Sequence, residues 1–224
     1  MGRPDPGRAR AQPLTSRAAR PTSRLPRLML VTDRHETRGR DLVDVVAAAV
    51  VSGGVRLVQV RERDLPEAEV GALLEHFIAR LRDTPVQLLV NGHASLARAF
   101  EIGLHLPAAA APVMFPKPRV YGRAAHDEDE VQRALAEGVS YLVVGPVFRT
   151  GSKPDHSGAG LETLARLAER AAPTPVFAIG GITPERVEPV LAAGAHGVAV
   201  RSGILAAPDP ARAAQAFVQA MPPT

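Results

Sequence analysis

Two apolar runs near the end of the chain are each followed by residues suited to holding an anion. Val176–Ile179 leads into Gly180-Gly181, and Gly197–Val200 leads into Arg201-Ser202-Gly203. Glycine lets backbone N–H groups approach a ligand closely because it has no Cβ. The last two strand-to-helix turns of a (β/α)8 barrel hold phosphate groups in this way. The residues of this predicted phosphate-binding site are Gly180, Gly181, Arg201, Ser202 and Gly203.

Cationic and hydrogen-bonding side chains also stand where the other apolar runs end. Such a set favours a small, phosphorylated ligand, with Arg61, Lys153 and Arg201 as candidate partners of its charge. The predicted substrate-binding residues are Gln59, Arg61, Arg63, Asn91, Thr150, Ser152 and Lys153. Others expected at the same strand ends are Thr32, Asp33, His105, Arg123, Ala124, His126 and Gly145.

The elements that must position these residues alternate regularly along the chain, which predicts a parallel α/β fold. The predicted strands are Leu28–Thr32, Arg56–Val60, Val86–Asn91, Gly103–Leu106, Val120–Arg123, Tyr141–Gly145, Val176–Ile179 and Gly197–Val200. The predicted helices are Asp41–Ser52, Leu65–Leu81, Ala94–Glu101, Asp127–Ala136, Leu161–Ala171 and Asp209–Met221, with further helix-forming sequence between the last two strands.

A repeat favours closure of these strands into a (β/α)8 TIM barrel. Three phrases read as helix end, glycine and buried strand, with glycines at 54, 138 and 194. Their separations of 84 and 56 residues are multiples of 28, a reasonable length for one strand–helix unit. A doubly wound sheet is the alternative, but the sequence after the first strand lacks the glycine fingerprint of that fold.

Composition limits the class of protein. The 224 residues suit one domain, and 46% hydrophobic content is ample for its core. The absence of cysteine excludes disulfides, thiolate metal sites and a cysteine nucleophile. No apolar run approaches the roughly 20 residues of a membrane span. We expect a cytoplasmic protein whose barrel covers residues 28–224.

The first 27 residues differ from the rest. They hold seven Arg and one Asp, whereas the remainder has 20 basic and 22 acidic residues and is mildly acidic. The segment is rich in Pro, Arg, Ala and Ser without apolar periodicity, which predicts a disordered tail. A nucleic-acid contact and a transit peptide are the alternatives. No aromatic residue is interleaved with the arginines, so no nucleic-acid function is expected.

The ordered motifs LVTD, QVRER, VNG, GLHLP, GRAAH, GPVFRTGSKP, FAIGGIT and GVAVRSGI resemble the thiamine phosphate synthase / thiazole tautomerase family of barrels. The resemblance spans about residues 28–220. It implies one of two chemistries. The synthase joins a pyrimidine diphosphate to a thiazole phosphate and releases pyrophosphate with Mg²⁺. The tautomerase aromatises a carboxythiazole phosphate without a metal.

The sequence departs from the synthase pattern where that pattern holds Mg²⁺. The resemblance implies an aspartate after the third-strand asparagine and another after the fourth strand. Here Gly92 follows Asn91, and Pro107 with a run of alanines follows Leu106. Because Mg²⁺ is usually held by one or two carboxylates plus substrate phosphates, their loss argues against a protein-held metal. We therefore expect no cofactor, and Mg²⁺ only if the chain is a synthase.

The resemblance is closer to the tautomerase branch, and it implies that His126 is the catalytic residue. An imidazole that titrates near neutral pH can remove one proton and deliver another. The favoured prediction is thus a metal-independent thiazole tautomerase, an isomerase. Ala124 departs from the serine usual in both branches.

Two further hypotheses stay open at this point. One is a Mg²⁺-dependent thiamine phosphate synthase, and the other is a non-catalytic protein that binds thiamin phosphate. The expected partner is a small phosphorylated thiazole rather than nucleic acid or membrane. Ala-rich helix faces permit a homodimer without requiring one.

Overall fold

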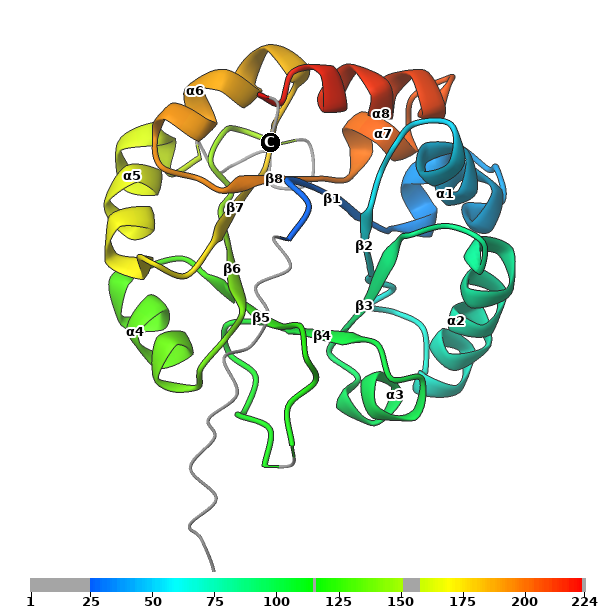
Figure 1. The fold of residues 1–224 in the computed structure, drawn as a ribbon, viewed down its shortest axis with the longest axis horizontal. Helices are drawn as coiled ribbons and strands as arrows, with labels where there is room; N and C mark the ends of the chain where they lie inside the picture. Colours follow the sequence, from blue (N-terminus) through cyan, green and yellow to red (C-terminus); the bar gives the residue numbers. More distant parts are fainter. Residues whose placement is uncertain (1–24, 115, 151–157, 223–224) are drawn as a thin grey trace, which may run out of the picture.

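The computed structural model describes residues 25–114, 116–150 and 158–222. Within them, eight parallel strands close into a barrel in chain order, and helices surround it (Figure 1). This confirms the predicted (β/α)8 fold. The strands are β1 (Leu28–Val31), β2 (Leu57–Val60), β3 (Gln87–Asn91), β4 (Gly103–Leu106), β5 (Tyr121–Ala125), β6 (Tyr141–Val144), β7 (Val176–Ile179) and β8 (Gly197–Val200).

The helices cover the outer face of the barrel. They are α1 (Leu42–Val51), α2 (Glu67–Leu81), α3 (Ala94–Ala99), α4 (Glu128–Ala136), α5 (Gly160–Ala171), α6 (Val187–Ala192), α7 (Ser202–Leu205) and α8 (Pro210–Gln219). Two short 3-10 helices, η1 (Arg34–Thr37) and η2 (Pro184–Arg186), follow β1 and β7. The sequence did not predict η1 or α7, because each is only one turn long and carries no apolar periodicity.

Aspartates begin several of these helices. The side chains of Asp41, Asp127 and Asp209 each accept a hydrogen bond from a backbone N–H in the first turn. An oxygen at this position satisfies a donor that has no partner within the helix. At the other end, the repeat glycines Gly54, Gly138 and Gly194 have φ of 83°, 71° and 91°. They are left-handed, as predicted for residues that end a helix.

The core has two layers. One lies between the strands and the helices, and the other fills the barrel, where Met29, Leu57, Leu89, Tyr141 and Phe177 are fully buried. The Tyr141 ring fits because β5 carries a glycine beside it. A Cβ at Gly122 would lie 2.1 Å from Cζ of Tyr141. The lower barrel is therefore packed with side chains, which leaves its upper mouth for a ligand.

The start of the described chain lies at the end of the barrel opposite the strand carboxyl ends. His196, which directly precedes β8, places its ring Nε2 2.8 Å from the carbonyl oxygen of Leu25, and the backbone N–H of Val198 donates to the carbonyl oxygen of Arg27. The predicted disordered tail otherwise lies outside the described residues. None of the helices in the described part of the chain is both long and apolar enough to cross a membrane.

Candidate active site at the mouth of the barrel

A cavity of about 230 Å³ opens where β7, β8 and neighbouring strands end. It contains every predicted phosphate-binding residue, together with three other predicted site residues, Arg61, His126 and Thr150. Its lining residues are Val31, Arg61, His126, Gly145, Pro146, Thr150, Ile179, Gly180, Gly181, Ile182, Ala199, Val200, Arg201, Ser202 and Gly203.

The turns after β7 and β8 expose backbone rather than side chains to this cavity. Gly180 and Gly181 have φ of 102° and 63°, a region that favours glycine. A Cβ at Gly180 would lie 2.5 Å from Cβ of Pro146, so the close approach of the two loops also requires glycine. After β8, Ser202 and Gly203 begin α7, where the first N–H groups have no partner within the helix. This backbone can hold a phosphate group.

Arg61 brings a positive charge to the cavity wall. Burial lowers the pKa of its guanidinium, and the neighbouring cations Arg63 and Arg201 lower that pKa further, while the carboxylates of Asp33 and Glu62 oppose this shift only in part. Among the described residues, none forms a hydrogen bond or ion pair with the Arg61 side chain, and only the backbone N–H of Arg61 is bonded, to the hydroxyl of Thr32. A partly buried cation beside two like charges is stabilised by an anion. The cavity therefore has the electrostatics of an anion site.

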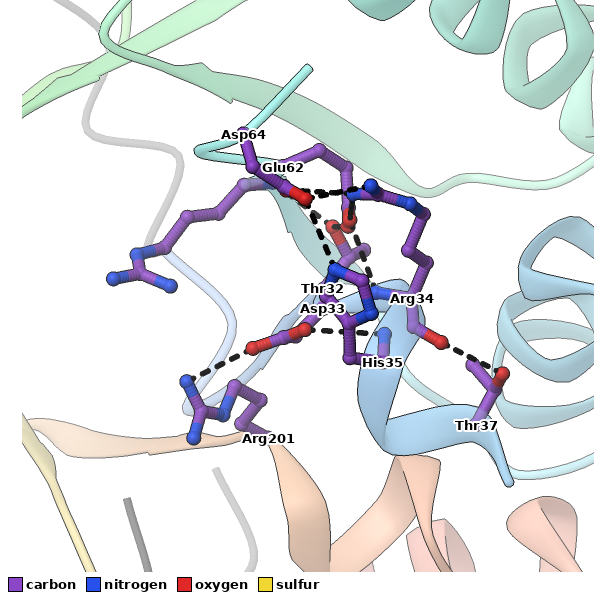
Figure 2. A network of polar contacts seen from close by, with 9 residues as sticks. Thr32, Asp33, Arg34, His35, Thr37, Glu62, Asp64 and Arg201 are labelled. Atoms are coloured by element: carbon purple, nitrogen blue, oxygen red, sulfur yellow. Dashed lines mark hydrogen bonds and ion pairs between the residues drawn. The ribbon is translucent and has the colours of Figure 1, made fainter. Parts of the chain in front are cut away.

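Arg201 lies in the same cavity but is already paired. Its Nη1 lies 3.1 Å from Oδ2 of Asp33, the pair drawn in Figure 2, and its Nη2 lies 3.0 Å from Oε1 of Glu36. Both carboxylates belong to the segment after β1, with Asp33 also capping η1. The charge of Arg201 is thus largely compensated, which leaves Arg61 as the stronger candidate for contact with an anion.

A buried carboxylate fixes the backbone next to Arg61. Glu62 accepts a hydrogen bond of 2.6 Å from Oγ1 of Thr32 and one of 3.0 Å from the backbone N–H of Arg34. The Thr32 hydroxyl oxygen in turn accepts from the N–H of Arg61 at 2.9 Å. The Glu62 side chain is only 1% exposed. Figure 2 shows how this network joins the ends of β1 and β2.

The outer part of the network is more exposed. Arg34 donates two hydrogen bonds of 2.6 Å to Asp64, and His35 places Nε2 3.0 Å from the same carboxylate (Figure 2). Arg34 foremost, and His35 next, hold the pKa of Asp64 well below its usual range. These contacts hold η1 against the segment after β2, which contains Arg61. The backbone that positions Arg61 at the mouth of the barrel is therefore fixed by hydrogen bonds and ion pairs.

His126 follows β5 and reaches the cavity from the side opposite β1. Its side chain is 51% exposed, and its Nδ1 lies 2.8 Å from Oε2 of Glu130. The predicted catalytic histidine therefore lines the same cavity as Arg61 and the anion-binding turns. Glu130 and Glu36 were not predicted as site residues. The four-residue spacing between His126 and Glu130 in the sequence was the available signal.

Four polar residues inside the barrel lie outside the cavity lining. Asn91 donates from Nδ2 to Oε1 of Gln59 at 3.3 Å, and Nδ1 of His105 lies 3.1 Å from the hydroxyl of Tyr141. Burial, then the charges of Arg61 and Arg123, lowers the pKa of His105 to about 3, so it is neutral. Burial raises the pKa of Tyr141 well above its usual range. The predicted substrate-binding residues Gln59 and Asn91 thus pair with each other.

The remaining predicted residues divide into two groups. The Arg63 side chain is exposed and does not line the cavity, although its charge acts on Arg61. Ser152 and Lys153 lie outside the described residues.

The expectation that Arg123 lies at the mouth is wrong. The strand β5 extends to Ala125, so Arg123 lies within it and is 4% exposed. Its Nε lies 2.9 Å from Glu137, and its Nη atoms donate to the carbonyl oxygens of Pro107, Ala108 and Ala110. Sequence spacing missed this because the two alanines after Arg123 carry no clear strand signal. Arg123 therefore stabilises the segment after β4 by hydrogen bonds to its carbonyl oxygens.

The residues after β3 and β4 do not fit a protein-held Mg²⁺. Gly92 and Pro107 stand where the family resemblance places carboxylates. The side-chain amide of Asn91 is already hydrogen-bonded to Gln59. In the part of the chain that the structure describes, no group of three or more His, Cys, Asp or Glu side chains is arranged to hold a metal ion.

Comparison with known proteins adds a family to this geometry. A family model described as thiamine monophosphate synthase matches residues 28–204. A putative thiamine-phosphate synthase of Geobacter sulfurreducens is 40% identical over 204 residues, covering 88% of this chain and 94% of the relative. A thiamine-phosphate synthase of a Roseiflexus species is 37% identical, covering 84% and 82%. A solved structure of thiamine phosphate pyrophosphorylase from Pyrococcus furiosus has a TM-score of 0.76 and 28% identity, covering 87% of this chain and 94% of its own.

These comparisons contradict the predicted tautomerase. Relatives of 37–40% identity that span most of both chains have the synthase name, and the family model has it too. The isomerase prediction, which rested on Gly92, Pro107 and His126, is therefore wrong. The alternative of a transferase that makes thiamine phosphate is better supported.

Proposed function

We propose that this chain is a transferase, because it belongs to the thiamine monophosphate synthase family. The reaction is the condensation of a pyrimidine diphosphate with a thiazole phosphate in thiamine biosynthesis. The thiazole ring nitrogen supplies the electron pair of a new C–N bond. The C–O bond to the diphosphate breaks, and its electron pair leaves with pyrophosphate.

The observation that supports this reaction most is that one cavity contains two groups able to bind anions, the backbone turns after β7 and β8 and the side chain of Arg61. Backbone turns at Gly180-Gly181 and Ser202-Gly203 suit the thiazole phosphate because they offer N–H groups without side chains. Arg61 suits the diphosphate because its guanidinium has no described partner. Thr150 and His126 line the same cavity and can share in binding this group, while Arg63 adds positive charge from outside the lining.

Charge on the departing diphosphate must be neutralised, and we assign this to side chains of the chain. Arg61 and His126 both line the cavity, while Arg63 adds a further positive charge near Arg61. Cations fixed where charge develops stabilise a transition state because they need no reorganisation. The proposal includes no resident metal, since the residues after β3 and β4 do not fit one.

The test is release of pyrophosphate from purified protein given both substrates, with formation of thiamine phosphate followed by chromatography. Reactions that lack either substrate are the controls, because hydrolysis of the diphosphate alone would also release phosphate-containing products. Pyrophosphate and thiamine phosphate formed in equal amounts support the proposal. Tight binding of thiamine phosphate without turnover would instead establish the non-catalytic binding protein.

A further inference from the structure

The carboxylate of Glu130 contacts His126 twice. Its Oε2 accepts a hydrogen bond of 2.7 Å from the backbone N–H of His126 and lies 2.8 Å from ring Nδ1. The N–H of Glu130 donates at 2.8 Å to Asp127, the residue that caps α4. This reciprocal arrangement resembles a capping box, in which a Glu or Gln in the first turn reaches back to the chain before the helix. The start of α4 therefore fixes both the backbone and the ring of His126.

The same contact determines which ring nitrogen is available. A carboxylate only accepts hydrogen bonds, so Nδ1 must carry the proton that it shares with Glu130. Within the described residues Nε2 has no partner, and the ring lines the cavity that also contains Arg61. Nε2 is thus the ring atom that can form a hydrogen bond with a ligand in the cavity. The other carboxylate oxygen of Glu130 lies 3.9 Å from Nη2 of Arg133, and the Glu130 side chain is only 20% exposed.

We propose that Glu130 is a positioning residue that holds His126 as the proton donor to the diphosphate leaving group. This inference rests on the proposed transferase function. When the C–O bond breaks, the imidazolium Nε2–H passes its proton to the departing oxygen, and the bond's electron pair leaves with pyrophosphate. The imidazole that remains is neutral. Its remaining proton stays on Nδ1, which donates it in the hydrogen bond to Glu130. The carboxylate stabilises the imidazolium before the transfer, as an acid–base histidine requires.

The decisive variant is Glu130→Gln. Glutamine is the other residue that forms a capping box, so α4 keeps its first-turn contact while the negative charge is lost. The matched control is Asp129→Asn, which removes an exposed carboxylate from the same turn without touching His126. Both variants and the wild type are assayed for kcat and for KM of each substrate. The ¹⁵N signals of the His126 ring are recorded in the absence of substrate.

Glu130→Gln is expected to lower kcat by about 10-fold with KM little changed, because acid–base assistance acts in the transition state. Asp129→Asn should match the wild type. The wild-type ring, when neutral, should carry its proton on Nδ1, and the Glu130→Gln ring should keep it there, because the amide oxygen that replaces Oε2 also accepts a hydrogen bond. A wild-type kcat in Glu130→Gln, a loss confined to KM, or a neutral wild-type ring that carries its proton on Nε2 would each overturn the inference. A wild type without turnover would overturn the transferase proposal, and the ring signals would still test the positioning.

Discussion

Replacement of Arg61 by methionine separates ligand binding from stability. The guanidinium lies partly buried at the mouth, repelled by Arg63 and Arg201, and no described residue bonds to it. Methionine keeps most of the apolar stem and removes the charge. We expect Arg61→Met to weaken anion binding while the free energy of unfolding holds or rises. This combination is unusual, because most substitutions of partly buried residues destabilise the fold.

The size of the binding loss follows from the contact that the variant removes. A hydrogen bond to a charged group contributes about 1.5–3 kcal/mol. Each 1.4 kcal/mol changes a dissociation constant about tenfold, so pyrophosphate should bind about 10- to 100-fold more weakly. The stability effect is smaller, because solvent screens the repulsion of Arg61 by the exposed Arg63. We expect no loss in a urea unfolding curve.

Calorimetric titration with inorganic pyrophosphate measures the first quantity, and urea unfolding measures the second. Arg80→Met is the matched control, since it removes an exposed cation from α2, away from the mouth. It should leave pyrophosphate binding unchanged. A wild-type dissociation constant for Arg61→Met would refute the assignment of Arg61 to the anion. A marked loss of stability would refute the view that the Arg61 guanidinium has no bonded partner in the free protein.

Three other substitutions test separate parts of the structure. Arg123→Met leaves Glu137 and three carbonyl groups without their buried partner, so urea unfolding should show a loss of about 3 kcal/mol or more, against little change for the exposed Arg98→Met. His105 has a folded pKa of about 3 against an ordinary value of 6.5, so its contribution to stability is complete above pH 6.5 and is lost as pH falls toward 3. His105→Gln should therefore lose roughly 2 kcal/mol less stability than the wild type between pH 6 and pH 4, and parallel curves would refute this. Gly92→Asp should cost about 1 kcal/mol because φ is +83°, yet the position has room for the side chain; calorimetry should detect Mg²⁺ binding to this variant and none to the wild type.

The sequence predicted the fold well because its signals were local and repeated. The runs Val176–Ile179 and Gly197–Val200 are strands with the predicted bounds, and the repeat glycines 54, 138 and 194 are left-handed. Each signal reflects a physical requirement: burial on both faces of a parallel strand, or a left-handed residue after a helix. The anion-binding turns followed from the same reasoning, because in a barrel these two strand ends must be neighbours.

Side-chain partnerships were harder to predict because they depend on distances between segments. Arg201 was predicted as an anion partner, yet Asp33 and Glu36 bind its guanidinium across 165 or more residues of chain. Arg123 was placed at the mouth from a strand end that lies two residues further on. Glu130 was not predicted as a site residue, since its contact with His126 depends on the rotamers of both side chains.

The function was the least predictable feature. The residues at 92 and 107 differ from a carboxylate pattern, and that difference was interpreted as evidence for another reaction. The family comparison favours the synthase instead. A missing metal ligand changes how charge is neutralised without determining which bond is made, because arginine and histidine can take part of the same role.

Pyrophosphate release by the wild-type protein tests the central claim most directly. The protein is incubated with the pyrimidine diphosphate and the thiazole phosphate, once with Mg²⁺ and once with a chelator, and pyrophosphate and thiamine phosphate are quantified together. We predict equal amounts of both products, formed only when both substrates are present, and persisting with the chelator. Absence of thiamine phosphate under both conditions would contradict the proposed function.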